Sequence, residues 1–174
     1  MKHKEAKNDQ VQTQRNAVCI LYPQDEQEVQ GIFSFTQEAA QQPVKIVGSL
    51  KNLQPNQAHG VSIHEYGDFY EIGNHYNPHN KQHGSPYYSE ERHLGDLGNI
   101  KADQFGFGYY TLSNNQISLF GELSILGRSL AIHKNQDDMG QGESKISLVN
   151  GNSGSVVACG IIGIASKFIN LQAK

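Results

Sequence analysis

Residues 59–68 read His-Gly-Val-Ser-Ile-His-Glu-Tyr-Gly-Asp, and they open the stretch of chain that decides the fold. Three further segments follow in order: Gly73-Asn-His75-Tyr-Asn-Pro78, Lys81-Gln-His83-Gly-Ser-Pro86 and Glu91-Arg-His93-Leu-Gly-Asp96-Leu-Gly-Asn99. The chain between residues 66 and 100 is rich in His, Gly, Asn and Pro, and it has no strand or helix pattern. A loop of this length is uncommon in a compact domain unless something organises it. Four of the eight histidines lie between residues 75 and 93, so a metal is the natural organiser.

The side chains of this loop form a donor set that suits zinc. His75, His83, His93 and Asp96 supply three imidazoles and one carboxylate, and four such ligands fit a tetrahedral zinc ion. The short spacing of His93 and Asp96 closes a chelate, and the two longer intervals fold the loop around the ion. These four residues are therefore the predicted zinc ligands.

Outside this loop the chain shows short alternating runs of apolar and polar residues, separated by Gly, Asn and Pro. They predict strands at residues 29–36, 43–50, 107–112, 116–121 and 129–133. No long helical period is present. Many short strands with turn signals between them predict an all-β sandwich or barrel of antiparallel strands.

Length and composition narrow the class of protein. A chain of 174 residues forms one domain with a sizeable core. A net charge of -3 without a basic stripe predicts neither a nucleic-acid partner nor an anionic membrane partner. The longest apolar stretches are too short to cross a bilayer. Residues 1–10 have no apolar segment of the kind found in secretory signals, so we expect a cytoplasmic protein.

The order of these motifs, with their neighbours, resembles the metal site of the Cu/Zn superoxide dismutase family over roughly residues 16–165. The resemblance implies an all-β fold, an eight-stranded antiparallel Greek-key β-barrel with a zinc loop and an electrostatic loop. It implies a zinc set of His75, His83, His93 and Asp96, in which His75 also bridges to copper.

Three residues near these ligands take other roles under the same resemblance. Asp137 matches an aspartate that orients a zinc histidine through a hydrogen bond, here His83. His59 matches a buried structural histidine and is assigned no metal. His79 falls outside the family pattern, so we expect it on the surface.

The copper half of the family's site is incomplete in this chain. The family reads H-G-F-H-V-H-E, with two copper ligands, and the first of them is Ser62 here. His64, His75 and His133 remain as a copper remnant. A serine hydroxyl is a poor copper ligand compared with imidazole. Three imidazoles suit trigonal Cu(I), whereas Cu(II) prefers a tetragonal set, so we expect weakened copper binding.

Two further departures from the family pattern affect the approach of superoxide to the copper site. Val156 stands where the family carries an arginine that guides superoxide to copper. The usual charged cluster of the steering loop aligns with Lys145, Ile146 and Val149, so two of its three positions are apolar. Together with Ser62, these changes predict little or no superoxide dismutation.

The resemblance also bears on domain organisation, thiols and partners. We expect a polar arm at 1–15, the dismutase-like domain at 16–165 and a short tail at 166–174. The family's loop cysteine is absent, so Cys19 and Cys159 are expected to be free thiols. The family's dimer interface is matched in the two segments Ile125–Arg128 and Gly160–Ala165 but not in its loop, which leaves a homodimer or another protein partner open.

Three functions follow from these observations. The first is a zinc-binding module with a degenerate copper site, acting as a binding or structural protein. The second is a working superoxide dismutase that converts superoxide to oxygen and hydrogen peroxide. The third is a copper-binding or carrier protein. Ser62 and Val156 favour the first function, whereas retention of His64 and His133 favours the other two.

Overall fold

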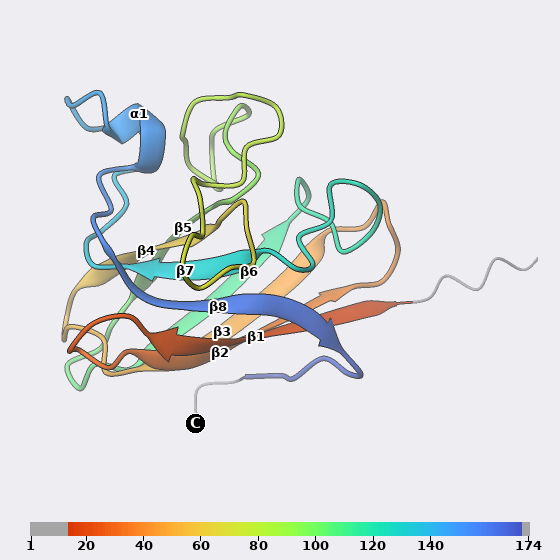
Figure 1. Cartoon of the computed structure of the whole chain (residues 1–174), viewed down its shortest axis with the longest axis horizontal. Coiled ribbons are helices and arrows are strands. Elements are labelled where there is room, and N and C mark those ends of the chain that lie inside the picture. The colour runs from red at the N-terminus through yellow and green to blue at the C-terminus, as the bar shows by residue number, and fades with distance from the viewer. Residues whose placement is uncertain (1–13, 172–174) are drawn as a thin grey trace, which may run out of the picture.

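Eight antiparallel strands form the body of the protein in the computed structural model, which describes residues 14–171 (Figure 1). The strands are β1 (Arg15–Pro23), β2 (Gln30–Gln37), β3 (Val44–Lys51), β4 (Ala58–Ile63), β5 (Asp96–Lys101), β6 (Gly108–Asn114), β7 (Ser129–His133) and β8 (Val156–Ala165). A single short helix, α1 (Ser147–Asn150), is found among these residues. No helix in the described part of the chain is long and apolar enough to cross a membrane.

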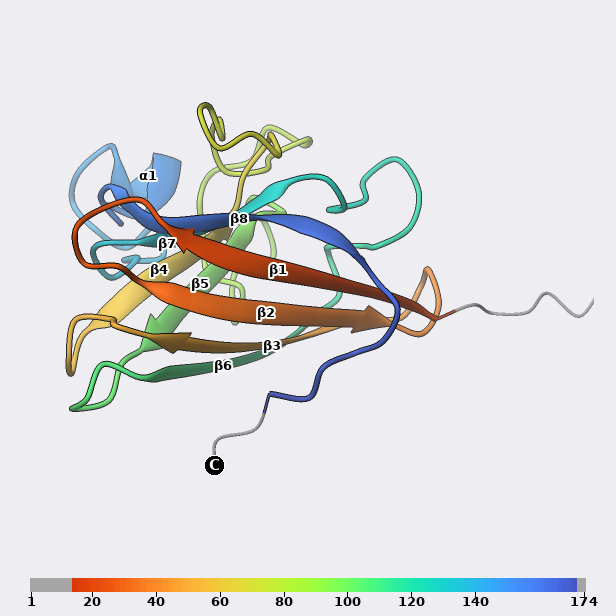
Figure 2. The same ribbon diagram turned by 60° about the horizontal axis from the view of Figure 1, so that its bottom comes forward.

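The strands curl into a barrel that is closed by side chains rather than by a backbone ladder. Their order is β5-β4-β7-β8-β1-β2-β3-β6, so the connections β3–β4 and β6–β7 cross between distant strands, as a Greek key requires. The two edge strands β5 and β6 come together, and the hydroxyl of Tyr110 on β6 donates to the carbonyl of Leu97 on β5 at 2.6 Å. Figure 2 shows the curled sheet from the side. The expected eight-stranded antiparallel barrel is confirmed.

The barrel interior is a continuous apolar core. Phe33 and Phe35 on β2 pack with aliphatic residues from the other strands, and each buried side chain of this size contributes roughly 1.5–3 kcal/mol. Gly48 on β3 makes room for the Phe33 ring, because a Cβ at this position would lie 2.6 Å from the ring edge. The core thus fixes the register of β2 against β3.

One predicted strand is wrong. Residues 116–121 lie in the β6–β7 connection and form only an isolated bridge at Ser118. The alternation of the sequence is real, because Ile117 and Leu119 are buried. Their backbone N–H groups donate instead to side chains: Ile117 to Asn114 Oδ1 at 3.2 Å and Leu119 to Gln37 Oε1 at 2.7 Å. Side-chain acceptors therefore replace the ladder that a strand would need.

The structure describes little of the predicted N-terminal arm but most of the predicted C-terminal tail. The predicted arm at 1–15 lies outside the described residues except for Gln14 and Arg15, and Arg15 begins β1. The first part of the predicted tail is described. The backbone N–H of Ile169 donates to Ser34 Oγ at 2.9 Å, so the tail runs against the outer face of β2 and covers Ser34.

Both cysteines are buried and free, as the sequence predicts. Burial raises the pKa of Cys19 to about 12 and also raises the pKa of Cys159. Neither side chain therefore forms a thiolate readily near neutral pH, and neither is placed to act as a nucleophile.

We predict that native protein leaves both thiols unreactive toward a thiol reagent at pH 8, because both are buried and protonated. The same titration in denaturant without reductant should count both Cys19 and Cys159. A Cys19–Cys159 disulfide found by mass spectrometry in protein prepared without oxidant would contradict this expectation.

Candidate metal centre

The metal-binding residues sit where the ends of two neighbouring strands meet two long loops. Val61 and Ile63 on β4 face the core. Because side chains alternate along a strand, Ser62 lies on the outer face, and so does His64, which directly follows the strand. Strand β7 pairs with β4 and ends at His133. The 64–95 loop and the 134–155 loop cover this face, and both lie on the same side of the barrel (Figure 1). All the candidate ligands are buried beneath them.

The four predicted zinc ligands converge on one point. The Nδ1 atoms of His75, His83 and His93 lie 2.8, 2.9 and 3.1 Å from Asp96 Oδ1. Ligands about 2 Å from a tetrahedral zinc ion lie about 3.3 Å apart, close to these separations. The structure therefore brings together all four residues that the sequence assigns to zinc.

Asp96 is held so that only one of its oxygens faces the imidazoles. Its Oδ2 accepts the backbone N–H groups of Gly84 and His93, each at 3.0 Å. Burial alone would raise the pKa of Asp96, but the interactions with His75, His83 and His93 outweigh burial and hold the pKa well below its usual range. The carboxylate is thus charged and aimed before any ion arrives.

Hydrogen bonds set the tautomers of two zinc histidines. The Nε2–H of His83 donates to Asp137 Oδ1 at 2.7 Å, and the Nε2–H of His93 donates to the Lys81 carbonyl at 2.9 Å. Their Nδ1 atoms are buried and have no hydrogen-bond partner within residues 14–171. Buried lone pairs without partners are costly unless a cation takes them, so the residues fit zinc.

A second cluster lies on the other side of His75. Its Nε2 is buried without a partner among the described residues, and His64 and His133 complete a three-imidazole group. The Nδ1–H groups of His64 and His133 donate to the carbonyls of Gly73 and Gly154, at 2.9 and 3.1 Å. Both Nε2 atoms therefore carry lone pairs. With Nδ1 in the zinc cluster and Nε2 in this one, His75 lies between the two.

Ser62 occupies part of this second cluster. Its Oγ lies 2.9 Å from His64 Nε2 and 2.8 Å from His133 Nε2. A hydroxyl has one hydrogen, so it donates to only one of these two atoms, and the other faces an oxygen lone pair. Burial lowers the pKa of His64 to about 3 and that of His133 to about 4, with a further contribution from His75. Both imidazoles are neutral, as metal binding requires.

The mouth above this cluster is a pocket of about 260 Å³ with no lysine or arginine in its lining. His64 and His133 form part of the wall, and Val149 and Val156 line it as well. Val149 is 57 % exposed, so an apolar side chain borders the entrance. This pocket offers a small anion no fixed positive charge on its way to the imidazoles.

The chain matches a known protein family. The sequence model of the copper/zinc superoxide dismutase family matches residues 29–162, which is most of the chain. The chain belongs to the Cu/Zn superoxide dismutase family. Each of the two clusters described above could hold a metal ion.

Several curated relatives cover almost the same length. A Cu-Zn superoxide dismutase of Cryptococcus neoformans var. grubii is 44 % identical over 154 residues, which cover 86 % of this chain and 98 % of that protein. A Cu-Zn superoxide dismutase of Kluyveromyces lactis is 43 % identical, with 87 % and 98 % covered. Superoxide dismutase 5 of Dictyostelium discoideum is 40 % identical, with 86 % and 98 % covered.

The remaining residues singled out in the sequence lie as follows. Asp137 is 2 % exposed and bonds His83 but, within the described chain, no imidazole of the copper cluster. His59 is fully buried, and its Nδ1–H donates to the His133 carbonyl at 2.9 Å. It is not part of either ligand cluster. His79 is on the surface.

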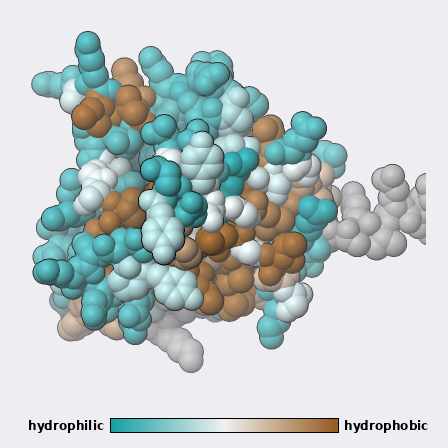
Figure 3. All heavy atoms as spheres, in the orientation of Figure 1, coloured by the Kyte–Doolittle hydropathy of each residue, from teal (hydrophilic) through white to brown (hydrophobic). Residues whose placement is uncertain are grey.

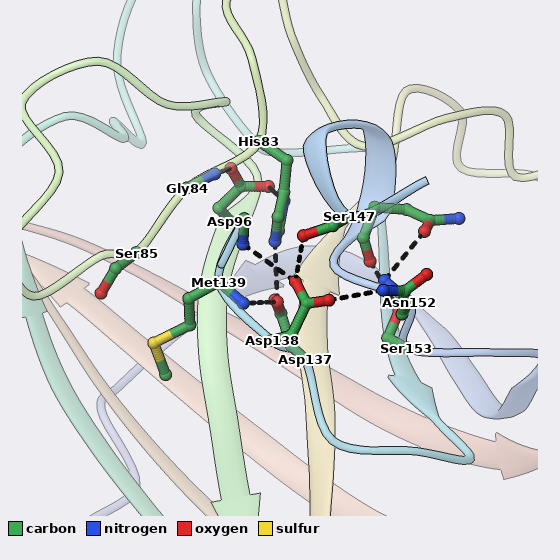
Figure 4. A network of polar contacts seen from close by, with 12 residues as sticks. His83, Gly84, Ser85, Asp96, Asp137, Asp138, Met139, Ser147, Asn152 and Ser153 are labelled. Atoms are coloured by element: carbon green, nitrogen blue, oxygen red, sulfur yellow. Dashed lines mark hydrogen bonds and ion pairs between the residues drawn. The ribbon is translucent and has the colours of Figure 1, made fainter. Parts of the chain in front are cut away.

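Sequence reasoning missed the residue next to Asp137. Asp138 Oδ1 accepts from Ser147 Oγ at 2.7 Å, and its Oδ2 accepts from Asn152 Nδ2 at 2.5 Å (Figure 4). These bonds lower the pKa of Asp138 despite the opposing effect of burial. The two aspartates thus tie the zinc histidine His83 to the loop that carries α1. The Asp-Asp pair itself was the only sequence signal for this role.

Gly151 is the second residue that sequence reasoning missed. It ends α1 with φ 67°, and a Cβ there would overlap Asp137 and His83. Glycine is required both by the left-handed backbone and by the close approach of the chain to the zinc histidine.

We predict that a chelator strong enough to remove zinc lowers the melting temperature clearly, because the loop then loses the ion that joins its four ligands. Calorimetry with and without the chelator measures the change. Re-adding about one equivalent of zinc should restore the original transition. A melting temperature that is unchanged by chelation and by added zinc would contradict a structural zinc site.

We predict that Gly151→Ala weakens zinc retention, because its Cβ displaces the Asp137–His83 pair. Gly121→Ala is the matched control, since Gly121 has φ 70° but no atom within 4 Å of the added Cβ. Both variants carry a similar backbone cost of about 1 kcal/mol. Only Gly151→Ala should lose zinc faster to a competing chelator, and equal loss from both variants would refute this reading.

Proposed function

We propose that this protein is a zinc-binding member of the Cu/Zn superoxide dismutase family with a degenerate copper site and little or no dismutase activity. It acts as a binding or structural module. The observation that carries the proposal is the place of Ser62, whose hydroxyl stands between the imidazoles of His64 and His133 where the family has a fourth imidazole.

Each half of the centre has its own task under this proposal. The converging atoms of His75, His83, His93 and Asp96 hold zinc, which fixes the 64–95 loop on the barrel. Copper, where bound, supplies the one-electron chemistry of dismutation. His64 and His133 offer it neutral nitrogen lone pairs, held in place by the Gly73 and Gly154 carbonyls. A hydroxyl in place of a fourth nitrogen lowers affinity for Cu(II) more than for Cu(I).

The capture of superoxide is weakened independently of copper. Electrostatic steering of an anion needs positive charge near the mouth of the site. Val149 and Val156 line that mouth, and no lysine or arginine does. Even with copper fully bound, the protein would therefore bind superoxide slowly.

Superoxide dismutation by a three-imidazole copper site is the second candidate function. It is supported by the names of the relatives, which are superoxide dismutases at 40–44 % identity over nearly their whole length. The convergence of His64, His75 and His133 supports it as well, because a scaffold alone has no need of all three. The rate of superoxide decay in the presence of copper-loaded protein, described below, separates the two candidate functions.

We further propose that two copies of the chain associate through the outer face of β1 and β8. Ile20 on β1 and Ile164 on β8 are 52 % and 82 % exposed, and Ile161 and Tyr66 lie among the exposed apolar residues as well. Figure 3 shows hydrophobic residues gathered over these strands. Members of this family commonly pair, and an apolar patch of this kind marks an interaction site.

We predict that copper-loaded protein dismutates superoxide at least ~100-fold more slowly than an intact family member, which corresponds to roughly 2.7 kcal/mol of lost transition-state stabilisation. Ser62→His should improve copper retention but leave a deficit in rate. Ser62→His with Val156→Arg should recover more than either change alone, because it restores both a ligand and a cation. Stopped-flow decay of superoxide measures all four proteins.

Metal content must be measured on the same samples, so that lost activity is not confused with lost copper. Near-normal activity of the unmodified protein would favour the second candidate and would require the degenerate-site reading to be dropped.

We predict that Ile164→Glu shifts the protein from dimer to monomer in analytical ultracentrifugation, because a carboxylate would be buried between two apolar faces. Phe105→Glu is the control, since Phe105 is exposed but lies in the turn between β5 and β6. A monomeric unmodified protein, or a dimer that survives Ile164→Glu, would refute pairing through this face.

A further inference from the structure

A polar hollow of about 360 Å³ lies on the outer side of the zinc loop, away from the mouth of the copper site. Its walls come from two segments, residues 86–90 and Arg92 of the 64–95 loop and residues 115–116 after β6. Gln116 joins them, because its Nε2–H donates to the Glu90 carbonyl at 3.2 Å. Neither the zinc set nor the copper set uses this hollow.

One arginine, Arg92, lines the hollow. Arg92 is only 5 % exposed, yet no hydrogen bond or ion pair of its guanidinium is formed within residues 14–171. Its Nε is fully buried without a partner. The other two arginines of the described chain do have partners: Arg15 donates to the Leu119 carbonyl, and Arg128 donates to the Glu65 carbonyl.

A buried guanidinium without an acceptor is unfavourable, and it is the group best shaped to hold a planar or tetrahedral oxyanion. The side chains of Asn115 and Gln116 border the same hollow and supply amide donors. Glu90 also borders it, so the lining holds one cation and one carboxylate.

We propose that this hollow binds a small oxyanion of the phosphate class, with Arg92 as its anchoring cation. The anion accepts hydrogen bonds from the guanidinium N–H groups that border the hollow, and it takes further hydrogen bonds from the amides of residues 115 and 116. Glu90 limits the number of anions to one and disfavours those with high charge. Since Arg92 directly precedes the zinc ligand His93, a bound anion also holds the outer side of the zinc loop.

The test is a titration of the zinc-bound protein with inorganic phosphate, followed by the NMR signal of the Arg92 Nε–H and the amides of residues 88–92 and 115–116. We expect one saturable site with a dissociation constant of about 1 mM. Zinc content is measured before and after, since loss of zinc would move the same signals. A parallel titration with acetate tests whether a carboxylate binds better, and tighter binding of acetate would overturn the phosphate class.

Gln116→Glu adds a second carboxylate to the hollow and should weaken phosphate binding at least ~tenfold. Lys45→Gln, which removes one exposed positive charge from β3, should leave binding unchanged. Arg92→Gln should abolish binding, and Gln116→Glu keeps the test decisive if that variant does not fold. Shifts that rise linearly without saturation, or equal binding by the unmodified protein and Gln116→Glu, would overturn the proposal.

Discussion

The metal centre depends on how one carboxylate is held. Asp96 begins β5, and its Oδ2 is fixed by two backbone N–H groups, so its Oδ1 alone faces three imidazoles. A charged oxygen in that place draws His75, His83 and His93 together, although they come from a loop with almost no regular structure. A zinc ion bound here would join four donors at once and so hold the long 64–95 loop against the barrel. His75 also belongs to the second cluster, so the same arrangement positions the third imidazole of that cluster.

The two halves of the centre differ in how their ligands are supported. In the zinc cluster, Asp137 and the Lys81 carbonyl set the tautomers of His83 and His93, and two backbone N–H groups orient Asp96. On the copper side the supporting bonds of His64 and His133 are equally well made, but the hydroxyl of Ser62 lies among their free nitrogens. The three imidazoles thus converge with a hydroxyl among them, which is the arrangement on which the proposed loss of copper affinity rests. Val149 and Val156 change the entrance in the same direction.

The alternating runs alone predicted an all-β sandwich or barrel of antiparallel strands, and the family resemblance supplied the eight-stranded Greek key and the assignment of the ligands to zinc and copper. His93 and Asp96 are three residues apart. Residues 29–36 show only an imperfect alternation, and β2 and β7 are buried on both faces over most of their length. The failures concern groups whose partners are distant in the chain. Residues 116–121 alternate like a strand, yet Gln37, some eighty residues earlier, supplies the acceptor for Leu119. The roles of Asp138 and Gly151 depend on how the α1 loop approaches His83. The sequence likewise does not show that Arg92 is buried with its Nε lacking a hydrogen-bond partner among the described residues, because that depends on residues distant in the chain.

The central claim is that the zinc set is complete and the copper set is not, and metal retention tests it most directly. Protein loaded with both metals is dialysed against a graded Cu(II) chelator, and zinc and copper per chain are counted for the unmodified protein and for Ser62→His. The account predicts that about one zinc per chain persists in both, while the unmodified protein releases copper at chelator concentrations that leave Ser62→His loaded. Equal copper retention by the two proteins would contradict it.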